Sequence, residues 1–238
     1  MAIIETEIDN NIAIITLNNG QNQQDLDFAK AMLATLDEIE ADKKVRAIVI
    51  TGSDEKHWST GINLNWLMAA INEKRHDDIK EFMYSMNEVF GRLLTIPLPV
   101  IASITGHAFG NGGMLACACD FRFMRMDRGY FCFPEVDINI PFLPGMIEFV
   151  KTAVPYYRFN EMKLTGRRVT AEELAKDHVL EAACPDAEAT LAAAKEFAAT
   201  FNKNRRIFGE HKRRLHKHIL KTFEEEDKPI IDALQLMV

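Results

Sequence analysis

The sequence contains no apolar stretch that approaches the roughly 20 residues needed to cross a bilayer. Its first residues, MAIIETE, lack both the basic segment of a secretion signal and the Arg-rich amphipathic pattern of a transit peptide. The last three residues, LMV, do not form a peroxisomal signal. From these absences we expect a cytoplasmic protein with no membrane segment.

Cysteine is scarce, with four residues, and two of them, Cys117 and Cys119, lie in an apolar stretch. A Cys-x-Cys pair without a second pair or a nearby histidine cluster is weak evidence for a metal site. We therefore expect reduced, buried thiols and no bound metal.

Positive charge is also in deficit, because the formal net charge is −7. The overall charge therefore gives no reason to expect nucleic-acid binding. The exception is a basic segment at residues 203–221, which contains eight lysines and arginines and three histidines. It is either the solvated face of a helix or a contact for the phosphates of an anionic ligand.

The 238 residues, of which 47% are hydrophobic, suffice for one domain with a large core. Apolar stretches typical of strands alternate with stretches of helical periodicity, which predicts βαβ units and a mainly parallel α/β sheet. Asp25, Asp186 and the pair Thr170 and Glu173 are expected to cap helices. Strands are expected at 3–5, 12–17, 45–50, 100–104, 121–124 and 130–133, and helices at 26–39, 79–94, 114–118, 187–201 and over most of the chain after 144.

Two loops with unusual sequences follow predicted strands, at residues 57–64 and 106–113. Ligands of open α/β sheets bind at the carboxyl ends of strands. The second loop contains GNGG at 110–113 before a helix, and free N–H groups at a helix start favour negative charge. The spacing matches neither a dinucleotide fingerprint nor a phosphate-binding P-loop. The two loops could form a two-donor oxyanion hole, and the alternative is close packing of helix on strand.

Glu135 lies among apolar residues, in the stretch FCFPEVDI at 131–138. If it is buried, loss of water raises its pKa and makes it suitable as a general base near neutral pH. The alternative is a surface glutamate in a loop. Asp137 would share a face with Glu135 if the segment were extended, but a structural role is favoured for it.

Seven segments, taken in order, resemble the crotonase family of enoyl-CoA hydratases and isomerases over nearly the whole chain. They are LNNGQN at 17–22, RAIVITG at 46–52, WSTGINL at 58–64, PVIASITGHAFGNGG at 99–113, CDFR at 119–122, FPEV at 133–136 and LTGRRVTAEEL at 164–174.

The resemblance implies an α/β fold with a ββα spiral core and a helical C-terminal region used in trimerisation. The core would span residues 1–185 and hold the acyl-CoA site. Residues 186–238 would pack on the core or on a neighbouring subunit, as part of one structural unit. Family members form trimers and often hexamers. Coenzyme A would be part of the substrate, so no separate cofactor is expected.

The resemblance also assigns roles to residues. The backbone N–H groups of Ile62 and Asn111 would hold the thioester oxygen as an enolate forms, and Glu135 would move the proton. Trp66, Met114 and Phe142 would line an acyl pocket. The alternative, which is favoured for each residue taken alone, is an ordinary place in the core. The residues expected to contact the substrate are Lys56, Ser59, Thr60, Gly61, Asn63, Leu64, Gly110, Gly112 and Met114.

Departures from the family pattern bear on the reaction. Hydratases of the family use two glutamates, and Met114 stands at the position of the first. One remaining carboxylate suits an isomerase that shifts the double bond of a 3-enoyl-CoA to give a 2-enoyl-CoA, and residues 123–138 particularly resemble the plant-type isomerases. The alternatives are a hydratase, thioesterase, dehalogenase or decarboxylase, or a non-catalytic oligomer that binds acyl-CoA. Since basic residues of the family's first and third segments are absent, Lys56 or segment 203–221 would hold the CoA phosphates.

Overall fold

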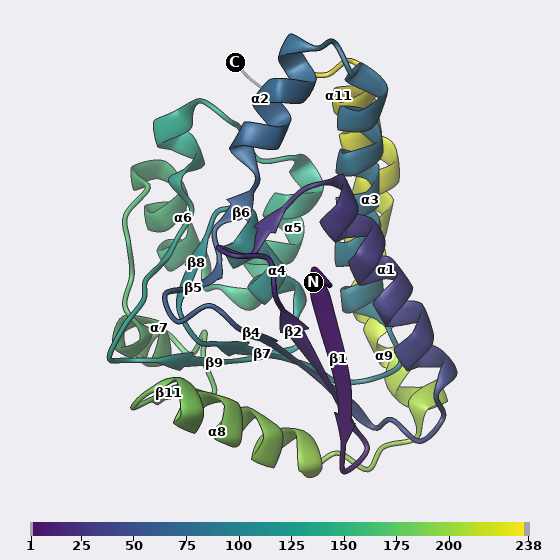
Figure 1. Cartoon of the computed structure of the whole chain (residues 1–238), viewed down its shortest axis with the longest axis vertical. Helices are drawn as coiled ribbons and strands as arrows, with labels where there is room; N and C mark the ends of the chain where they lie inside the picture. Colours follow the sequence, from purple (N-terminus) through teal and green to yellow (C-terminus); the bar gives the residue numbers. More distant parts are fainter. Residues whose placement is uncertain (1, 236–238) are drawn as a thin grey trace.

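The computed structural model describes residues 2–235, so residue 1 and residues 236–238, including the C-terminal tripeptide, lie outside it. A six-stranded sheet lies in the lower part of the fold in Figure 1. β1 is antiparallel to β2, and the other neighbours are parallel, which confirms the predicted α/β class. In spatial order the strands are β1 (Ile4–Asp9), β2 (Ile12–Leu17), β4 (Ala47–Gly52), β7 (Val100–Ile104), β9 (Phe121–Arg125) and β11 (Ala182–Cys184).

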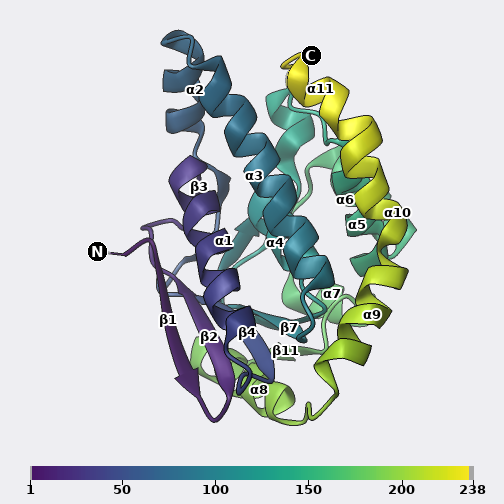
Figure 2. The ribbon, with the colours of Figure 1, turned by 90° about the vertical axis from the view of Figure 1, so that its right-hand side faces the viewer.

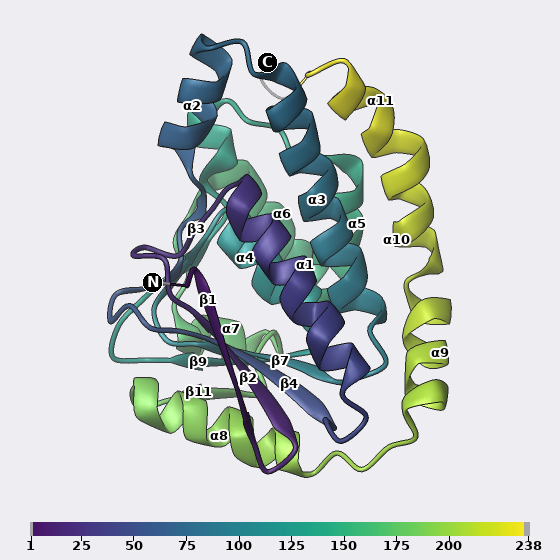
Figure 3. The ribbon, with the colours of Figure 1, turned by 45° about the vertical axis from the view of Figure 1, so that its right-hand side comes forward.

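The central strands are apolar on both sides because helices cover both faces of the sheet. In β2, Ala13 and Ile15 belong to the main core, whereas Ile12 and Ile14 belong to a second core beneath the sheet. α8 (Ala187–Ala199) covers this second core, and Figure 3 shows it on the opposite side of the sheet from the other long helices. The main core is covered by α1 (Leu26–Ala41), α3 (His76–Thr95) and α4 (Asn111–Ala118).

Two further groups of short strands include residues of the two segments 57–64 and 106–113. β5 (His57–Ser59), β8 (His107–Phe109) and β10 (Phe131–Cys132) form one parallel sheet. β3 (Gln23–Gln24) and β6 (Gly61–Ile62) form a parallel pair. The predicted strand at 130–133 is thus shorter than expected. The strands β3, β5, β6 and β8 were not predicted, and neither was β11 of the six-stranded sheet, since two or three residues are too few for a strand period.

The predicted helix caps are confirmed. Asp25 accepts a hydrogen bond from the backbone N–H of Phe28 at 3.1 Å, and Asp186 accepts one from Ala189 at 2.8 Å. Thr170 and Glu173 form the predicted capping box. The helices not yet mentioned are α2 (Leu64–Asn72), which was not predicted, α5 (Pro144–Ala153), α6 (Tyr156–Thr165), α7 (Ala171–Lys176), α9 (Arg205–Leu215), α10 (Lys217–Thr222), the π-helix η2 (Phe223–Asp227) and α11 (Lys228–Asp232).

The C-terminal helices pack on the core of the same chain, as Figure 2 shows for α9 to α11. The Lys212 ammonium is buried and lies 2.6 Å from Asp120 Oδ2. The buried Asp227 carboxylate accepts hydrogen bonds from the Gly145 backbone N–H at 2.8 Å and from Asn87 Nδ2 at 3.0 Å. These two hydrogen bonds tie the C-terminal segment to the start of α5 through Gly145 and to α3 through Asn87. Part of the basic segment 203–221 is therefore structural.

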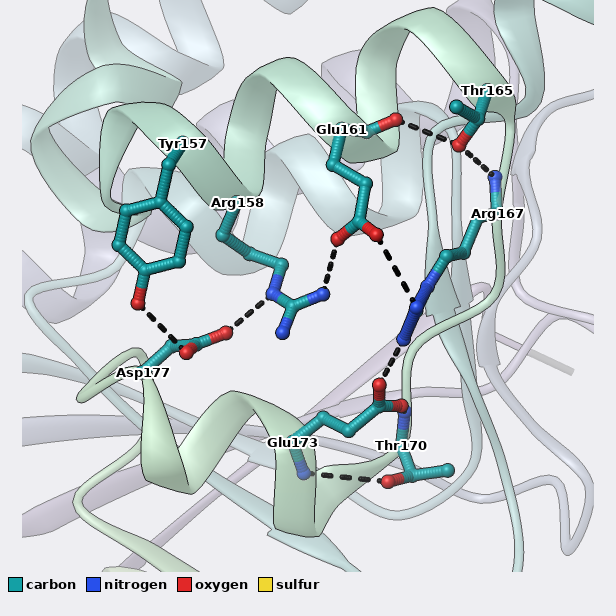
Figure 4. Close-up of polar contacts among 8 residues, drawn as sticks. All are labelled: Tyr157, Arg158, Glu161, Thr165, Arg167, Thr170, Glu173 and Asp177. Atoms are coloured by element: carbon teal, nitrogen blue, oxygen red, sulfur yellow. Dashed lines mark hydrogen bonds and ion pairs between the residues drawn. The ribbon is translucent and has the colours of Figure 1, made fainter.

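A chain of polar contacts joins α6 to α7 (Figure 4). Asp177 accepts from Tyr157 Oη at 2.8 Å and pairs with Arg158, which also pairs with Glu161. Arg167 then bridges Glu161 and Glu173, so the network ends at the capping box of α7. It braces the loop that contains Gly166, where an added Cβ would collide with the Asp137 carboxylate.

The four cysteines are unpaired and buried, as predicted. Among residues 2–235, no helix combines the length and the apolar character needed to cross a membrane. Within the same range, no group of three histidine, cysteine or acidic side chains is placed to hold a metal ion.

Candidate active site

A cavity of about 710 Å³ lies between α2, α3, α5 and the C-terminal segment. Its wall is mostly apolar, and it brings together Ile62, Asn111, Met114 and Glu135, four residues singled out in the sequence. Among the described residues that line it, Glu135 is the one acidic side chain. The remaining lining residues are Leu67, Ile71, His76, Ile79, Met83, Ile140, Pro141, Phe142, Leu143, Pro144, Met146, Ile230, Leu234 and Gln235.

Glu135 is held in the wall by the 3₁₀ helix η1 (Pro134–Ile138). The preceding Phe131 and Phe133 are fully buried and pack edge to face, with ring centroids 5.5 Å apart. The Glu135 side chain is therefore drawn into the core, where 9% of the residue is exposed. Its Oε2 has no hydrogen-bond partner in the described chain. Burial raises the pKa of Glu135 from its ordinary 4.5 to about 7, which places it in the range of a general base.

Gly110 provides the space that Glu135 occupies. A Cβ at position 110 would lie 2.9 Å from Glu135 Oε1, and the φ angle of Gly110 is +54°, where side chains are disfavoured. The carboxyl group therefore lies beside the residue that immediately precedes α4. This contact explains why the glycine-rich loop and Glu135 share one wall of the cavity.

Ile62 and Asn111 both line the cavity, and their backbone N–H groups are the candidate donors. Asn111 is the first residue of α4, so its N–H has no acceptor within the helix. The Asn63 N–H donates to Gln24 O at 2.8 Å. Because successive N–H groups of a strand point to opposite sides, the Ile62 N–H points away from β3.

The close approach of β6 to α4 depends on Gly61. A Cβ at this residue would lie 2.7 Å from Phe109 O and 2.8 Å from Asn111 N, and its φ angle is +80°. No other residue type would let the two backbones lie this close without a shift. The arrangement places two N–H donors and a carboxyl group with a raised pKa around one cavity, which suits stabilisation of an oxyanion and transfer of a proton.

The other residues predicted to contact the substrate do not line this cavity. Ser59 is buried, and its Oγ accepts from Gly61 N at 3.3 Å and donates to Asn22 O at 2.7 Å. The substrate contacts of all eight of these residues remain predictions. These residues are Lys56, Ser59, Thr60, Gly61, Asn63, Leu64, Gly110 and Gly112.

Of the three side chains expected to line an acyl pocket, one does not line the cavity. Trp66 does not line the cavity and instead packs edge to face on Phe82, with centroids 5.2 Å apart. Asp137 does not share a face with Glu135, because the segment is a 3₁₀ helix and Asp137 is exposed. Met114 and Phe142 line the cavity as expected.

Sequence reasoning missed the cavity residues from α2, the start of α3 and the C-terminal segment. Leu67 and Ile71 belong to the unpredicted helix α2, whose apolar residues are not confined to one face. Ile230 and Leu234 lie about 95 residues beyond Glu135 in the chain, and no local pattern indicates that they return to it.

The profile of the enoyl-CoA hydratase/isomerase family matches residues 7–234. "Enoyl-CoA delta isomerase 3" of Arabidopsis thaliana is 29% identical over 185 residues, which cover 73% of this chain and 75% of the relative. "Short-chain-enoyl-CoA hydratase" of Clostridium acetobutylicum is 28% identical over 169 residues, covering 70% and 63% of the two chains.

Solved structures share the fold. That of human mitochondrial delta3-delta2-enoyl-CoA isomerase has a TM-score of 0.88 at 16% identity and covers 98% of this chain and 90% of its own. That of enoyl-CoA hydratase from Bacillus halodurans has a TM-score of 0.86 at 19% identity and covers 97% and 94%. The predicted crotonase-like fold is thus confirmed.

Proposed function

Because the chain belongs to the enoyl-CoA hydratase/isomerase family, we propose that it converts a 3-enoyl-CoA into a 2-enoyl-CoA through proton transfer by Glu135. The observation that carries the proposal is that Glu135 is the one carboxylate among the described residues of the cavity wall, which also includes the apolar Met114. Hydration requires a positioned water as well as a proton donor and acceptor, whereas migration of a double bond requires one group that accepts and returns a proton.

The proposed reaction begins with the thioester oxygen between the N–H groups of Ile62 and Asn111. Glu135 removes a proton from C2, and the electron pair of that C–H bond forms the enolate, whose charge the two donors stabilise. The dienolate then takes the proton back at C4, so the double bond moves from C3–C4 to C2–C3. The substrate and product have the same composition, and Glu135 ends ionised as it began.

Hydration of a 2-enoyl-CoA is the second candidate, because relatives named as hydratases match the chain about as well as those named as isomerases. Incubation with 3-enoyl-CoA and with 2-enoyl-CoA separates the two reactions. We expect the 3-enoyl form to become 2-enoyl-CoA without addition of water. A 3-hydroxyacyl-CoA product would contradict isomerisation, and tight binding without turnover would indicate a binding protein. Assembly into trimers stays a prediction from the resemblance.

The pH dependence of kcat/KM should report the ionisation of Glu135. The base acts only when ionised, and burial raises its pKa to about 7. We therefore expect kcat/KM to rise about tenfold per pH unit below 7 and to level off above it. A profile that is flat between about pH 5.5 and 8 would mean that a carboxylate of ordinary pKa, or another group, is the base.

The apolar cavity suggests an aliphatic acyl chain as its occupant, and α2 offers a test. Ile71 lines the cavity, whereas Met68 lies on the same helix, is exposed and does not line it. Ile71→Trp should reduce kcat/KM for a long-chain 3-enoyl-CoA about 10-fold relative to a short-chain one, because the indole occupies acyl space. Met68→Trp should leave this ratio unchanged. Equal effects of the two variants would place the acyl chain elsewhere.

A further inference from the structure

Gln24 is a fully buried polar residue between the two segments that supply the N–H donors. It ends the short strand β3, which pairs in parallel with β6 so that Gln24 lies opposite Ile62. Its backbone oxygen accepts from the Asn63 N–H at 2.8 Å. Gln24 therefore holds the donor strand through its main chain.

The side chain of Gln24 holds the other donor segment. Its Oε1 accepts from Asn111 Nδ2 at 2.7 Å, and its Nε2 lies 3.4 Å from the backbone oxygen of Asn111. Nε2 also lies 3.3 Å from Ser59 Oγ, which in turn accepts from the Gly61 N–H. One amide group thus contacts the side chain and main chain of Asn111 and the hydroxyl that supports Gly61.

The orientation of this amide group is determined by its neighbours. If the oxygen and nitrogen of Gln24 were exchanged, Oε1 would face the carbonyl oxygen of Asn111, and both would be acceptors. Asn111 is itself 4% exposed, so neither amide can find water as a substitute partner. Gln24 can make all of these hydrogen bonds in only one orientation of its amide, whereas Asn111 Oδ1 has no partner among the described residues.

We propose that Gln24 is a positioning residue that sets the separation and direction of the Ile62 and Asn111 N–H donors. The inference rests on the proposed function only in requiring that these donors hold an enolate. Gln24 touches no reacting atom and acts through the strand and helix start that it joins. A donor displaced by about 1 Å can cost on the order of 10²-fold in rate, so loss of the amide should act on catalysis more than on substrate binding.

The experiment measures enolate formation directly, with acetoacetyl-CoA as the probe. The bound enolate of this β-ketothioester absorbs in the near ultraviolet, and its signal does not depend on turnover. Gln24→Met keeps the size of the side chain and removes its hydrogen bonds. We expect the bound enolate fraction to fall about 10-fold and kcat to fall about 10- to 100-fold, with KM and the affinity for the probe changed less than about 3-fold.

Asn111→Ala provides a second variant, because it removes the partner amide and keeps the backbone N–H. It should resemble Gln24→Met, and the double variant should be no worse than either, since both remove the same contact. Asn87→Leu is the matched control. It breaks the buried hydrogen bond to Asp227, away from the donors, and should lower thermal stability without changing the enolate fraction.

Each outcome decides between a positioning and a structural role. An enolate fraction in Gln24→Met equal to that of the wild type would overturn the proposal, as would additive losses in the double variant. Absence of an enolate signal in the wild type would also overturn it, because no donor pair would exist to be positioned. A wild-type enolate signal without isomerisation would contradict the proposed function alone.

Discussion

Glu135→Gln is expected to lower kcat for the isomerisation about 10²- to 10⁴-fold while KM changes little. The amide cannot accept the C2 proton, but it has nearly the shape of the carboxyl group that lies beside Gly110. Thermal stability should not fall, because Glu135 Oε2 makes no hydrogen bond in the described chain and an ionised carboxylate is costly to bury. Steady-state kinetics and thermal unfolding of the purified variant test both statements.

Asp137→Asn is the matched control for this variant. Asp137 lies on the same 3₁₀ helix, but it is exposed and does not line the cavity. The Asp137→Asn variant should keep kcat within a factor of about two of the wild-type value. If Glu135→Gln kept wild-type activity, or if the two variants lost activity equally, the base would lie elsewhere. His76 would then be the first candidate, since it also lines the cavity.

Gly61→Ala is expected to reduce kcat about 10²- to 10³-fold, an effect comparable to loss of one oxyanion donor. The added Cβ would lie 2.7 Å from Phe109 O and 2.8 Å from Asn111 N, so β6 and the start of α4 must separate. Both N–H donors then leave their positions at once. The kcat of the variant, and the bound enolate signal of acetoacetyl-CoA, measure the loss.

Gly20→Ala separates this effect from backbone strain. Gly20 also has a positive φ angle, +55°, but a Cβ there would meet no atom within 4 Å. Gly20→Ala should lose about 1–2 kcal/mol of stability, because the left-handed conformation is unfavourable for alanine. Gly61→Ala should lose more, because β6 and α4 must also separate. Only Gly61→Ala should lose activity. A similar loss of kcat in both variants would show that strain, and not the separation of the donors, is responsible.

The sheet and the long helices could be predicted because their signals are local. The strands β2, β4 and β7 are apolar on both faces, and the helices α1 and α8 begin at Asp25 and Asp186, which act as caps. Burial of Glu135 could also be anticipated from the aromatic residues before it. The single-carboxylate hypothesis depended on resemblance, since nothing about Met114 by itself indicates a missing glutamate.

The remaining parts of the site depend on contacts between segments that are distant in the chain. The donors Ile62 and Asn111 converge because Gly61 packs on the start of α4, and the spacing of the residues does not encode this contact. The hydrogen bonds of Gln24 span 35 and 87 residues. The C-terminal wall of the cavity follows from tertiary contacts such as that between Asp227 and Gly145. Such contacts leave no periodic signal in a single sequence.

In the proposed reaction one buried carboxylate, Glu135, carries a proton from C2 to C4. A 3-enoyl-CoA that is deuterated at C2, converted in a single turnover and analysed by NMR and mass spectrometry, tests it most directly. We predict a 2-enoyl-CoA of unchanged composition with deuterium recovered at C4, because Glu135 is shielded from water while it holds the label. A 3-hydroxyacyl-CoA product, or a 2-enoyl-CoA whose C4 carries only solvent protons, would contradict the claim.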